Sequence, residues 1–168
     1  MKTTRKKIKD TFSYKDGWLY WEKVSPYRPD RLGKKAGCKS AYGHGVLIRW
    51  ENSLHRASRL IWAWHYGVIK RDLVIDHIDG NPYNNRIENL RAVPQWENCR
   101  NMKIPSHNKS GCIGVHKTGS KTSPWCAQIR AAKGTTKHLG WFSTFEKAKA
   151  ARIEAEKLYG YHSNHGRI

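Results

Sequence analysis

The stretch of residues 74–90, VIDHIDGNPYNNRIENL, does most to limit how this chain can fold. It begins with a short apolar run that favours a strand, and the dipeptide Asp79-Gly80 favours a tight turn directly after it. Asparagine is frequent in and just after this window, at Asn81, Asn84, Asn85, Asn89 and Asn98. Because Asn, Asp and Gly hydrogen-bond the backbone of irregular loops, the window predicts a strand that runs into a structured loop.

The composition points to a polyanionic partner. The chain has 32 Lys and Arg against 13 Asp and Glu, a formal net charge of +19, and both of its halves are basic. Nucleic acid is the first candidate and an anionic membrane the second. No apolar run approaches the roughly 20 residues of a spanning helix, and no apolar signal core follows the basic N-terminus. We therefore expect an intracellular protein that is not secreted, with no membrane partner and no evident protein partner.

Turn residues predict short elements in the N-terminal half. Residues 1–11 are rich in cations and predict a solvated basic arm. Aromatic residues on both sides of Asp16-Gly17 predict a hairpin. Residues 25–45 predict a loop with at most a short strand, and residues 45–52 predict a further strand.

Helical periodicity appears at residues 54–67, with Gly67 suited to the C-cap. The residues of its apolar face are Leu54, Ala57, Leu60, Ile61 and Trp64. A second, short helix is expected in residues 94–102, because Pro94 suits a first helical turn.

A change of composition near Pro105 predicts a domain boundary, with a linker at residues 105–110. Three strand candidates follow, and then a helix that Thr144 can cap. The strand candidates are residues 112–117, 124–131 and 136–143, and the apolar stripe of the helix is Phe145, Ala148, Ala151, Ala155 and Leu158. We expect two domains, at residues 12–104 and 111–162, and an α+β fold class in which a small three-stranded antiparallel sheet packs on one helix in the second domain.

Asp76 and His77 combine the groups needed for phosphodiester hydrolysis. Carboxylate and amide oxygens are hard ligands for a divalent metal ion, and an imidazole can accept a proton from water near neutral pH. In a strand the two side chains point to opposite faces. A calcium loop is excluded, since Ile78 and Asn81 stand where an oxygen ligand and a glycine are required. The four cysteines contain no CxxC pair and so indicate neither a structural zinc site nor a disulfide framework.

Together with residues 94–102, the window resembles the HNH endonuclease family, in the cysteine-free form common among phage and intron-encoded enzymes. The resemblance covers about residues 12–103 and implies a ββα-metal nuclease domain with Mg²⁺ or Mn²⁺ and no structural zinc. By this resemblance His77 is the general base, and Asp76 and Asn98 are metal ligands. Asn89 corresponds to the middle asparagine of the motif, which steadies the loop and the orientation of the histidine.

Some residues of the window keep two interpretations. Relatives often have His-Arg-Leu where this chain has Ser58-Arg59-Leu60, and His55 lies one turn earlier. Asp79, Asn84 and Asn85 are expected to form turns. Arg86 and Arg91 either clamp phosphate or are solvated.

The C-terminal half resembles the Apetala/ethylene-response-factor DNA-binding domain, over about residues 109–160. The matching residues are Gly114, Val115, Trp125, Ala127, Ile129, Leu139, Gly140, Phe142, Thr144 and Ala148. The resemblance implies that Trp125 and Arg130 contact DNA, and charge and position add Lys117 and Lys137. Gln128 is a further candidate for reading a base edge. Trp141, Phe142 and Phe145 are expected in the core.

The sequence thus predicts a metal-dependent endonuclease of phage or homing type that acts on double-stranded DNA through a water activated by histidine. The alternative is a non-catalytic, sequence-specific DNA-binding regulator with a relic HNH loop. An RNA nuclease would use the same site residues. One site per chain makes nicking the simpler expectation.

Overall fold

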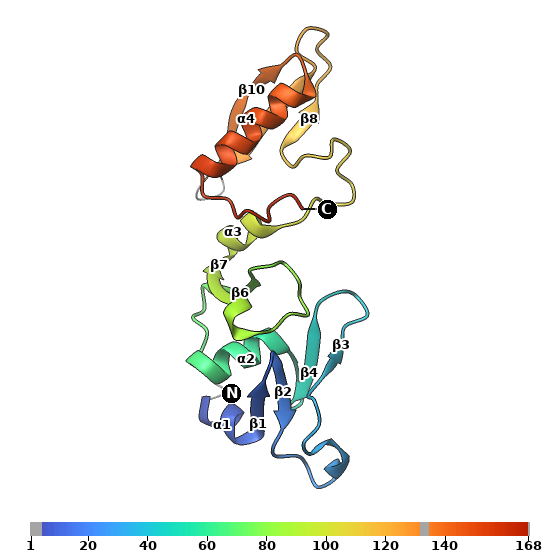
Figure 1. The fold of residues 1–168 in the computed structure, drawn as a ribbon, viewed down its shortest axis with the longest axis vertical. Coiled ribbons are helices and arrows are strands. Elements are labelled where there is room, and N and C mark those ends of the chain that lie inside the picture. Colours follow the sequence, from blue (N-terminus) through green and yellow to red (C-terminus); the bar gives the residue numbers. More distant parts are fainter. Residues whose placement is uncertain (1–4, 132–134, 168) are drawn as a thin grey trace. The chain divides into compact units, whose positions relative to one another are not determined.

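The computed structural model describes residues 5–131 and 135–167 (Figure 1). Helices and strands are mixed along the chain, so the α+β fold class is confirmed. The chain divides into two compact units, Met1–Gln95 and Trp96–Ile168. No helix in the described part of the chain is long and apolar enough to cross a membrane.

The division falls nine residues before the expected linker, because residues 96–104 pair with the end of the chain. The Ile104 amide donates to the Arg167 carbonyl at 2.8 Å, and the Gly166 amide donates to the Met102 carbonyl at 2.9 Å. The Arg100 guanidinium donates to the Tyr159 carbonyl at 2.6 Å. Residues 96–104 therefore belong to the C-terminal unit by their hydrogen bonds.

Helix α1 (Arg5–Thr11) replaces most of the expected basic arm. The expectation of a solvated arm is wrong for residues 5–11, because Ile8 is only 1% exposed and joins the core. The Lys9 ammonium lies 4.4 Å from the centre of the Trp64 ring, and the Arg5 guanidinium donates to the Trp64 carbonyl. Residues 1–4 of the expected arm lie outside the described residues.

Two small sheets precede the first long helix. The hairpin at Asp16-Gly17 is confirmed, with positive φ angles of 48° and 83° at its turn. The second sheet has the order β3-β4-β5, and a 3₁₀ turn, η1 (Pro29–Arg31), lies between the sheets. The strands are β1 (Phe12–Lys15), β2 (Trp18–Trp21), β3 (Cys38–Lys39), β4 (Val46–Trp50) and β5 (Ser53–Arg56).

Helix α2 (Ala57–Tyr66) begins three residues later than periodicity predicted. Leu54 is wrongly placed on its apolar face, because it pairs with Arg49 in strand β5 and is 57% exposed. The expected C-cap is confirmed, since the Gly67 amide donates to the Ala63 carbonyl and Gly67 has a φ of 89°.

An antiparallel hairpin of β6 (Leu73–His77) and β7 (Leu90–Pro94) follows α2. The segment between its strands contains the 3₁₀ turn η2 (Ile87–Asn89). After β7 come α3 (Gln95–Asn98) and η3 (Cys99–Asn101), so Pro94 ends a strand and does not lie in a first helical turn.

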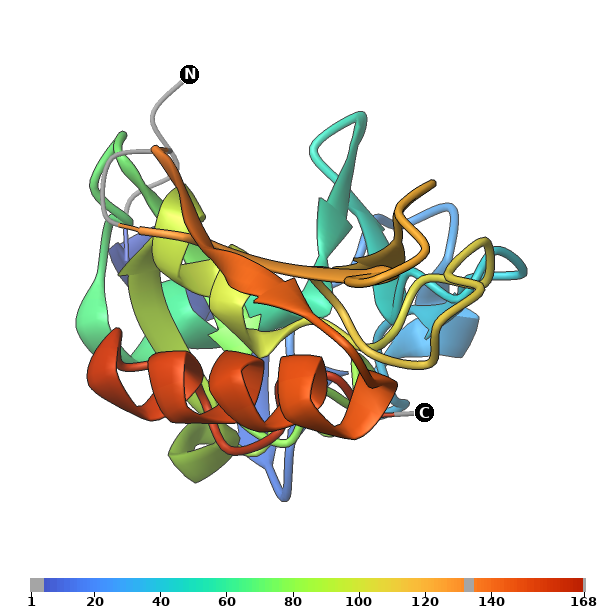
Figure 2. The same cartoon turned by 90° about the horizontal axis from the view of Figure 1, so that it is seen from above.

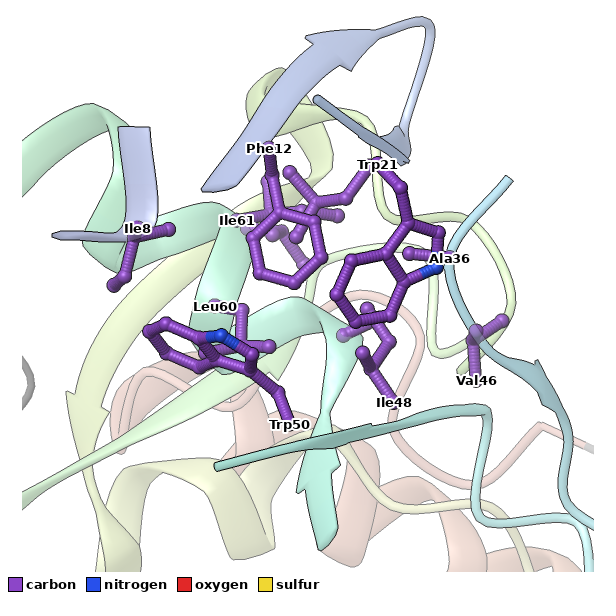
Figure 3. Packing of buried hydrophobic residues seen from close by; sticks show 12 residues of the cluster. Ile8, Phe12, Trp21, Ala36, Val46, Ile48, Trp50, Leu60 and Ile61 are labelled. Carbon is purple, nitrogen blue, oxygen red and sulfur yellow. The ribbon is translucent and has the colours of Figure 1, made fainter. Parts of the chain in front are cut away.

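Aromatic rings pack among aliphatic side chains in the core of the N-terminal unit (Figure 3). The Phe12 ring lies 4.6 Å from the Trp21 ring and 5.5 Å from the Trp50 ring, measured between ring centres. The Trp64 indole N–H donates to the Phe12 carbonyl at 2.9 Å. These contacts connect the first hairpin to α2, the helix that precedes the β6–β7 hairpin in the chain.

In the C-terminal unit, α4 packs along one face of a three-stranded antiparallel sheet (Figure 2), as predicted. The sheet has the order β10-β9-β8, with β8 (Val115–Lys117), β9 (Trp125–Arg130) and β10 (Thr136–Phe142). Helix α4 (Phe145–Leu158) begins after Thr144, whose side chain accepts a hydrogen bond from the Lys147 amide. Ala148 and Ala155 are buried, but Leu158 is 80% exposed and does not belong to the buried stripe.

We expect Ile8→Ala to lower the free energy of unfolding of the N-terminal unit by about 2–5 kcal/mol, because the change leaves a cavity in the core. Leu54→Ala should change it by less than about 0.5 kcal/mol, as is usual for exposed positions. Urea denaturation of both variants measures this difference. Equal effects would contradict the burial of α1.

Candidate functional site

Asp76 and His77 end strand β6 and face opposite sides of the hairpin, as strand geometry requires. Asp76 stands directly across from Arg91 on β7. The Asp76 side chain is 7% exposed, and its Oδ2 accepts from Arg91 Nε at 2.9 Å and Nη2 at 2.8 Å. Arg91 therefore offsets the charge of the Asp76 carboxylate and orients it. The Nε and Nη2 atoms of Arg91 are used in this contact inside the protein.

His77 contacts a buried amide. Its Nε2 lies 3.0 Å from Oδ1 of Asn85, a residue that is only 3% exposed. The Asn85 amide nitrogen donates to the Tyr83 carbonyl at 3.5 Å, which assigns Oδ1 to the histidine side. With Oδ1 as the acceptor, the proton of a neutral ring lies on Nε2, and Nδ1 is then the nitrogen that can accept a proton. The sequence indicated only a turn at Asn85, and no local signal marked this contact.

Asn89 joins the two ends of the loop between β6 and β7. Its Oδ1 accepts from the Asp79 amide at 3.0 Å, and its Nδ2 donates to Asp79 Oδ1 at 2.9 Å and to the Asn84 carbonyl at 2.8 Å. Asp79 Oδ2 accepts from the Asn84 side chain at 2.7 Å, and Asp79 Oδ1 accepts from the Asn81 amide at 2.8 Å. Asp79 and Asn84 form turns, as predicted, and their carboxylate and amide groups belong to one network.

This network favours an ionised Asp79. Burial opposes ionisation, but the hydrogen bonds from Asn84, Asn81 and Asn89 outweigh it and lower the pKa of Asp79 below its ordinary value of 3.8. A carboxyl group whose pKa is lowered on folding stabilises the folded state above its unfolded pKa. That contribution is lost as the pH falls through the lower pKa of the folded state.

A pocket of about 160 Å³ lies beside His77. Its lining residues are Gly43, His44, Val46, Arg56, Ser58, Ile75, His77, Pro82 and Asn85. Gly45, next to this pocket in the chain, has a φ of 83°. A Cβ at this position would lie 2.4 Å from the Pro82 carbonyl oxygen, so only glycine fits there. His44 and Arg56 are polar groups beside His77 that the sequence did not single out.

The upstream histidine does not line this pocket. Ser58 occupies the pocket wall and is buried. The His55 Nε2 instead lies 3.2 Å from the Trp50 carbonyl oxygen, near the opposite end of β5. The position that is often histidine in relatives is therefore a serine in the pocket, and His55 does not replace it.

The donors proposed for a divalent metal are the Asp76 carboxylate and the Asn98 amide oxygen. Asp76 lies in the N-terminal unit, and Asn98 ends α3 in the C-terminal unit. Both donors are hard oxygens, which suits Mg²⁺ or Mn²⁺. Among the described residues, no group of three or more His, Cys, Asp and Glu side chains could hold a metal ion.

The strand register separates the predicted DNA-contacting residues of the C-terminal unit into two rows. Gln128 and Arg130 alternate with Ala127 and Ile129, which are buried toward α4. Gln128 and Arg130 therefore lie on the open face of the sheet, away from α4. Of the two candidates in the N-terminal unit, Arg86 is exposed just before η2, whereas Arg91 pairs with Asp76.

Trp125, Lys117 and Lys137 belong to the row on the α4 side. The Trp125 ring packs 5.0 Å from the Phe145 ring, and the Lys117 ammonium lies 5.4 Å from the Trp125 ring centre. The Lys137 ammonium lies 5.9 Å from the Tyr159 ring centre. Lys117 and Lys137 lie on the two outer strands and can meet DNA at the edges of the sheet, whereas Trp125 lies on the central strand against Phe145 of α4.

Trp141 is not in the core, contrary to expectation. It is 65% exposed, and its ring stacks on His138 at 4.0 Å between ring centres. A β-bulge between His138 and Gly140 shifts the alternation of β10, which places Trp141 on the open face and Phe142 against α4. Phe142 and Phe145 pack against the buried cluster of this unit, as predicted.

Comparisons with known proteins agree with this geometry for part of the chain. Residues 55–100 match the sequence model of the HNH endonuclease family, so this segment carries an HNH endonuclease domain. Protein 3.8 of Escherichia phage T7 is 46% identical over 55 residues, which are 33% of this chain and 46% of the phage protein. The chain thus spans about half the length of this curated relative. No solved structure matches the chain.

We expect Asp79→Asn to lower the free energy of unfolding at neutral pH, because the amide cannot replace the charged acceptor of the loop network. The difference from the unchanged protein should shrink as the pH falls below 3.8. Urea denaturation at pH values from 7 to about 3 measures both trends. Asp72→Asn, an exposed position before β6, is the control and should show neither.

Proposed function

We propose that this protein is a metal-dependent DNA endonuclease that hydrolyses phosphodiester bonds. The observation that carries the proposal is His77, which lies within the matched HNH segment and is fixed by Asn85 on the wall of a pocket. The relative in a phage supports a role inside an infected bacterial cell.

His77 acts as the general base in this proposal. Nδ1 accepts a proton from water as the water oxygen attacks phosphorus, and the bond between phosphorus and the leaving oxygen breaks. The leaving oxygen then takes a proton from solvent. Asn85 keeps Nε2 protonated, so the basic lone pair stays on Nδ1, and Asn89 keeps the loop that carries Asn85 in place.

Asp76 would be a ligand of the metal ion, with Arg91 orienting its carboxylate, and Asn98 stays the second ligand that the family resemblance predicts. A bound divalent ion supplies positive charge for the phosphate and the leaving oxygen. Asn98 is neutral, so as a ligand it would add no negative charge to repel the phosphate backbone.

The open face of the C-terminal sheet is the proposed duplex-binding surface. Gln128 and Arg130 can reach base edges there, and Trp141 adds an exposed aromatic surface. Trp125 supports this sheet from the α4 side, and Lys117 and Lys137 fit contacts to phosphates along the sheet edges. Arg86 is a further phosphate contact beside the loop.

A second candidate is a DNA-binding protein that does not cut. The Arg91–Asp76 ion pair favours it, because a guanidinium on Oδ2 competes with a metal ion for that oxygen. This candidate predicts DNA binding that is unaffected by chelation.

We expect the protein to convert supercoiled plasmid to open circles with Mg²⁺ or Mn²⁺, and His77→Ala to reduce the rate by about 10²–10⁴-fold through loss of the base. EDTA should abolish conversion. His55→Ala is the matched control and should cut at nearly the original rate, because His55 contacts Trp50 and not the pocket. An intact plasmid with every metal, alongside a normal mobility shift of duplex DNA, would establish the second candidate.

We expect Asn85→Ala to slow cleavage at saturating DNA by roughly 10-fold or more, part of what a positioned general base contributes, with little change in DNA affinity. Asn85→Asp keeps an acceptor oxygen toward Nε2 and should retain more activity. His55→Ala removes a side chain that contacts Trp50 outside the pocket and serves as control. Single-turnover rates measure the effect, and ¹⁵N spectra of the imidazole show whether the proton leaves Nε2. An unchanged tautomer in Asn85→Ala would contradict the positioning role.

A further inference from the structure

A larger pocket, of about 520 Å³, lies elsewhere in the N-terminal unit. Its wall is formed by α1, the segment that follows β2, and the turn between β4 and β5. Trp21 and Trp50 line it, and each is only 8% exposed (Figure 3). Two residues of the hydrophobic core therefore form part of the wall of this pocket, called the basic pocket below.

Cations outnumber acids in the pocket wall. Lys7, Lys23, Arg28, Arg31 and Arg49 line it, against Asp10 and Glu51. Lys7 pairs with Glu51, and Arg28 pairs with Asp30. Within residues 5–131 and 135–167, no ion pair involves Lys23, Arg31 or Arg49. Three cations thus line one hollow without an ion-pair partner among the described residues, and cations exceed acids in its wall by three.

Their side chains come from separate segments. Lys23 follows β2, Arg31 ends η1, and Arg49 projects from β4. The Arg31 guanidinium lies 6.0 Å from the centre of the Trp21 ring, which helps to hold it in the wall. Like charges around one hollow repel one another, and an anion in the hollow reduces that cost.

We propose that this basic pocket binds a phosphate of the DNA backbone, at a second contact separate from the His77 pocket. Arginine presents paired N–H donors that match phosphate oxygens, and two of the three cations that lack an ion pair are arginines. The inference rests on the proposed function only in taking DNA as the polyanion. It assigns binding and no chemistry to this pocket.

The two pockets lie at opposite ends of one strand. Val46 lines the His77 pocket and Trp50 lines the basic pocket, four residues further along β4. At about 3.3 Å per residue this is roughly 13 Å. Each strand of a duplex carries a charge about every 3.4 Å along the axis, so roughly four nucleotides span that distance. A single duplex is therefore long enough to span the separation between the two pockets.

The test compares two variants with equal charge, each in the full chain with His77→Ala so that DNA stays intact. The first carries Lys23→Gln, Arg31→Gln and Arg49→Gln in the basic pocket. The second carries Lys6→Gln, Lys70→Gln and Arg71→Gln, at exposed positions outside it. Fluorescence anisotropy of a labelled duplex gives the dissociation constant over a range of salt concentrations.

We expect the pocket variant to bind more weakly than the control, with a salt dependence shallower by at least about 0.9 in log–log slope, the value for one phosphate contact. Equal changes in both variants would overturn the proposal, because they would report net charge alone. Arg49→Gln by itself alters one exposed side chain and should shift affinity in the same direction, which keeps the test valid if the triple variant unfolds.

Inorganic phosphate distinguishes a backbone contact from a site for a small anion. Saturable thermal stabilisation by phosphate that is lost in the pocket variant, together with unchanged DNA affinity, would overturn the proposal. Plasmid cleavage by the chain with His77 intact is scored separately. If the pocket variant binds DNA more weakly than the control but the chain with His77 does not cut plasmid, the proposed nuclease is disproved and the pocket assignment stands. If the chain cuts plasmid and both variants bind DNA equally, the pocket assignment is disproved and the proposed nuclease stands.

Discussion

The hydrogen bonds of the Asn89 side chain hold the loop on which the candidate site depends. They connect the Asp79 backbone, the Asp79 carboxylate and the Asn84 carbonyl, so both ends of the loop are fixed by one residue. His77 ends β6, and Asn85 lies inside the loop, so their contact exists only while the loop keeps this path. The hydrogen bonds of Asn89 thus act on the His77 imidazole indirectly. They fix the backbone between His77 and Asn85, which are eight residues apart.

Local features of the fold could be predicted from the sequence, because residues two to four apart determine them. The turn at Asp16-Gly17 requires positive φ at both positions, and Gly67 and Thr144 end and begin helices through their own backbone and side-chain chemistry. The α+β class follows from the alternation of such short elements. The expected role of Asn89 as a steadying residue has a physical basis in the contacts that it makes.

Features set by tertiary contact could not be predicted. Ile8 looked like one apolar residue in a solvated arm, and only the core shows why residues 5–11 form a helix. Leu54 fitted a helical stripe, yet pairing with Arg49 places it in a strand. The position of Trp141 depends on a bulge at Gly140, and two adjacent aromatic residues cannot both face α4 in a regular strand. The contact between Asn85 and His77 depends on the path of a loop whose asparagines look alike in sequence.

Arg91 links the register of the β6–β7 hairpin to the chemistry proposed for Asp76. The register places the two side chains directly across from each other, where opposite charges attract. An ionised carboxylate that is 7% exposed is costly to bury alone, and the guanidinium offsets that cost in the folded chain. The carboxylate is therefore oriented by the protein itself, independently of any metal ion. A metal ion that binds Asp76 shares the carboxylate with the Arg91 guanidinium. The affinity of Asp76 for the metal ion therefore depends on how strongly the positive charge of Arg91 offsets the carboxylate.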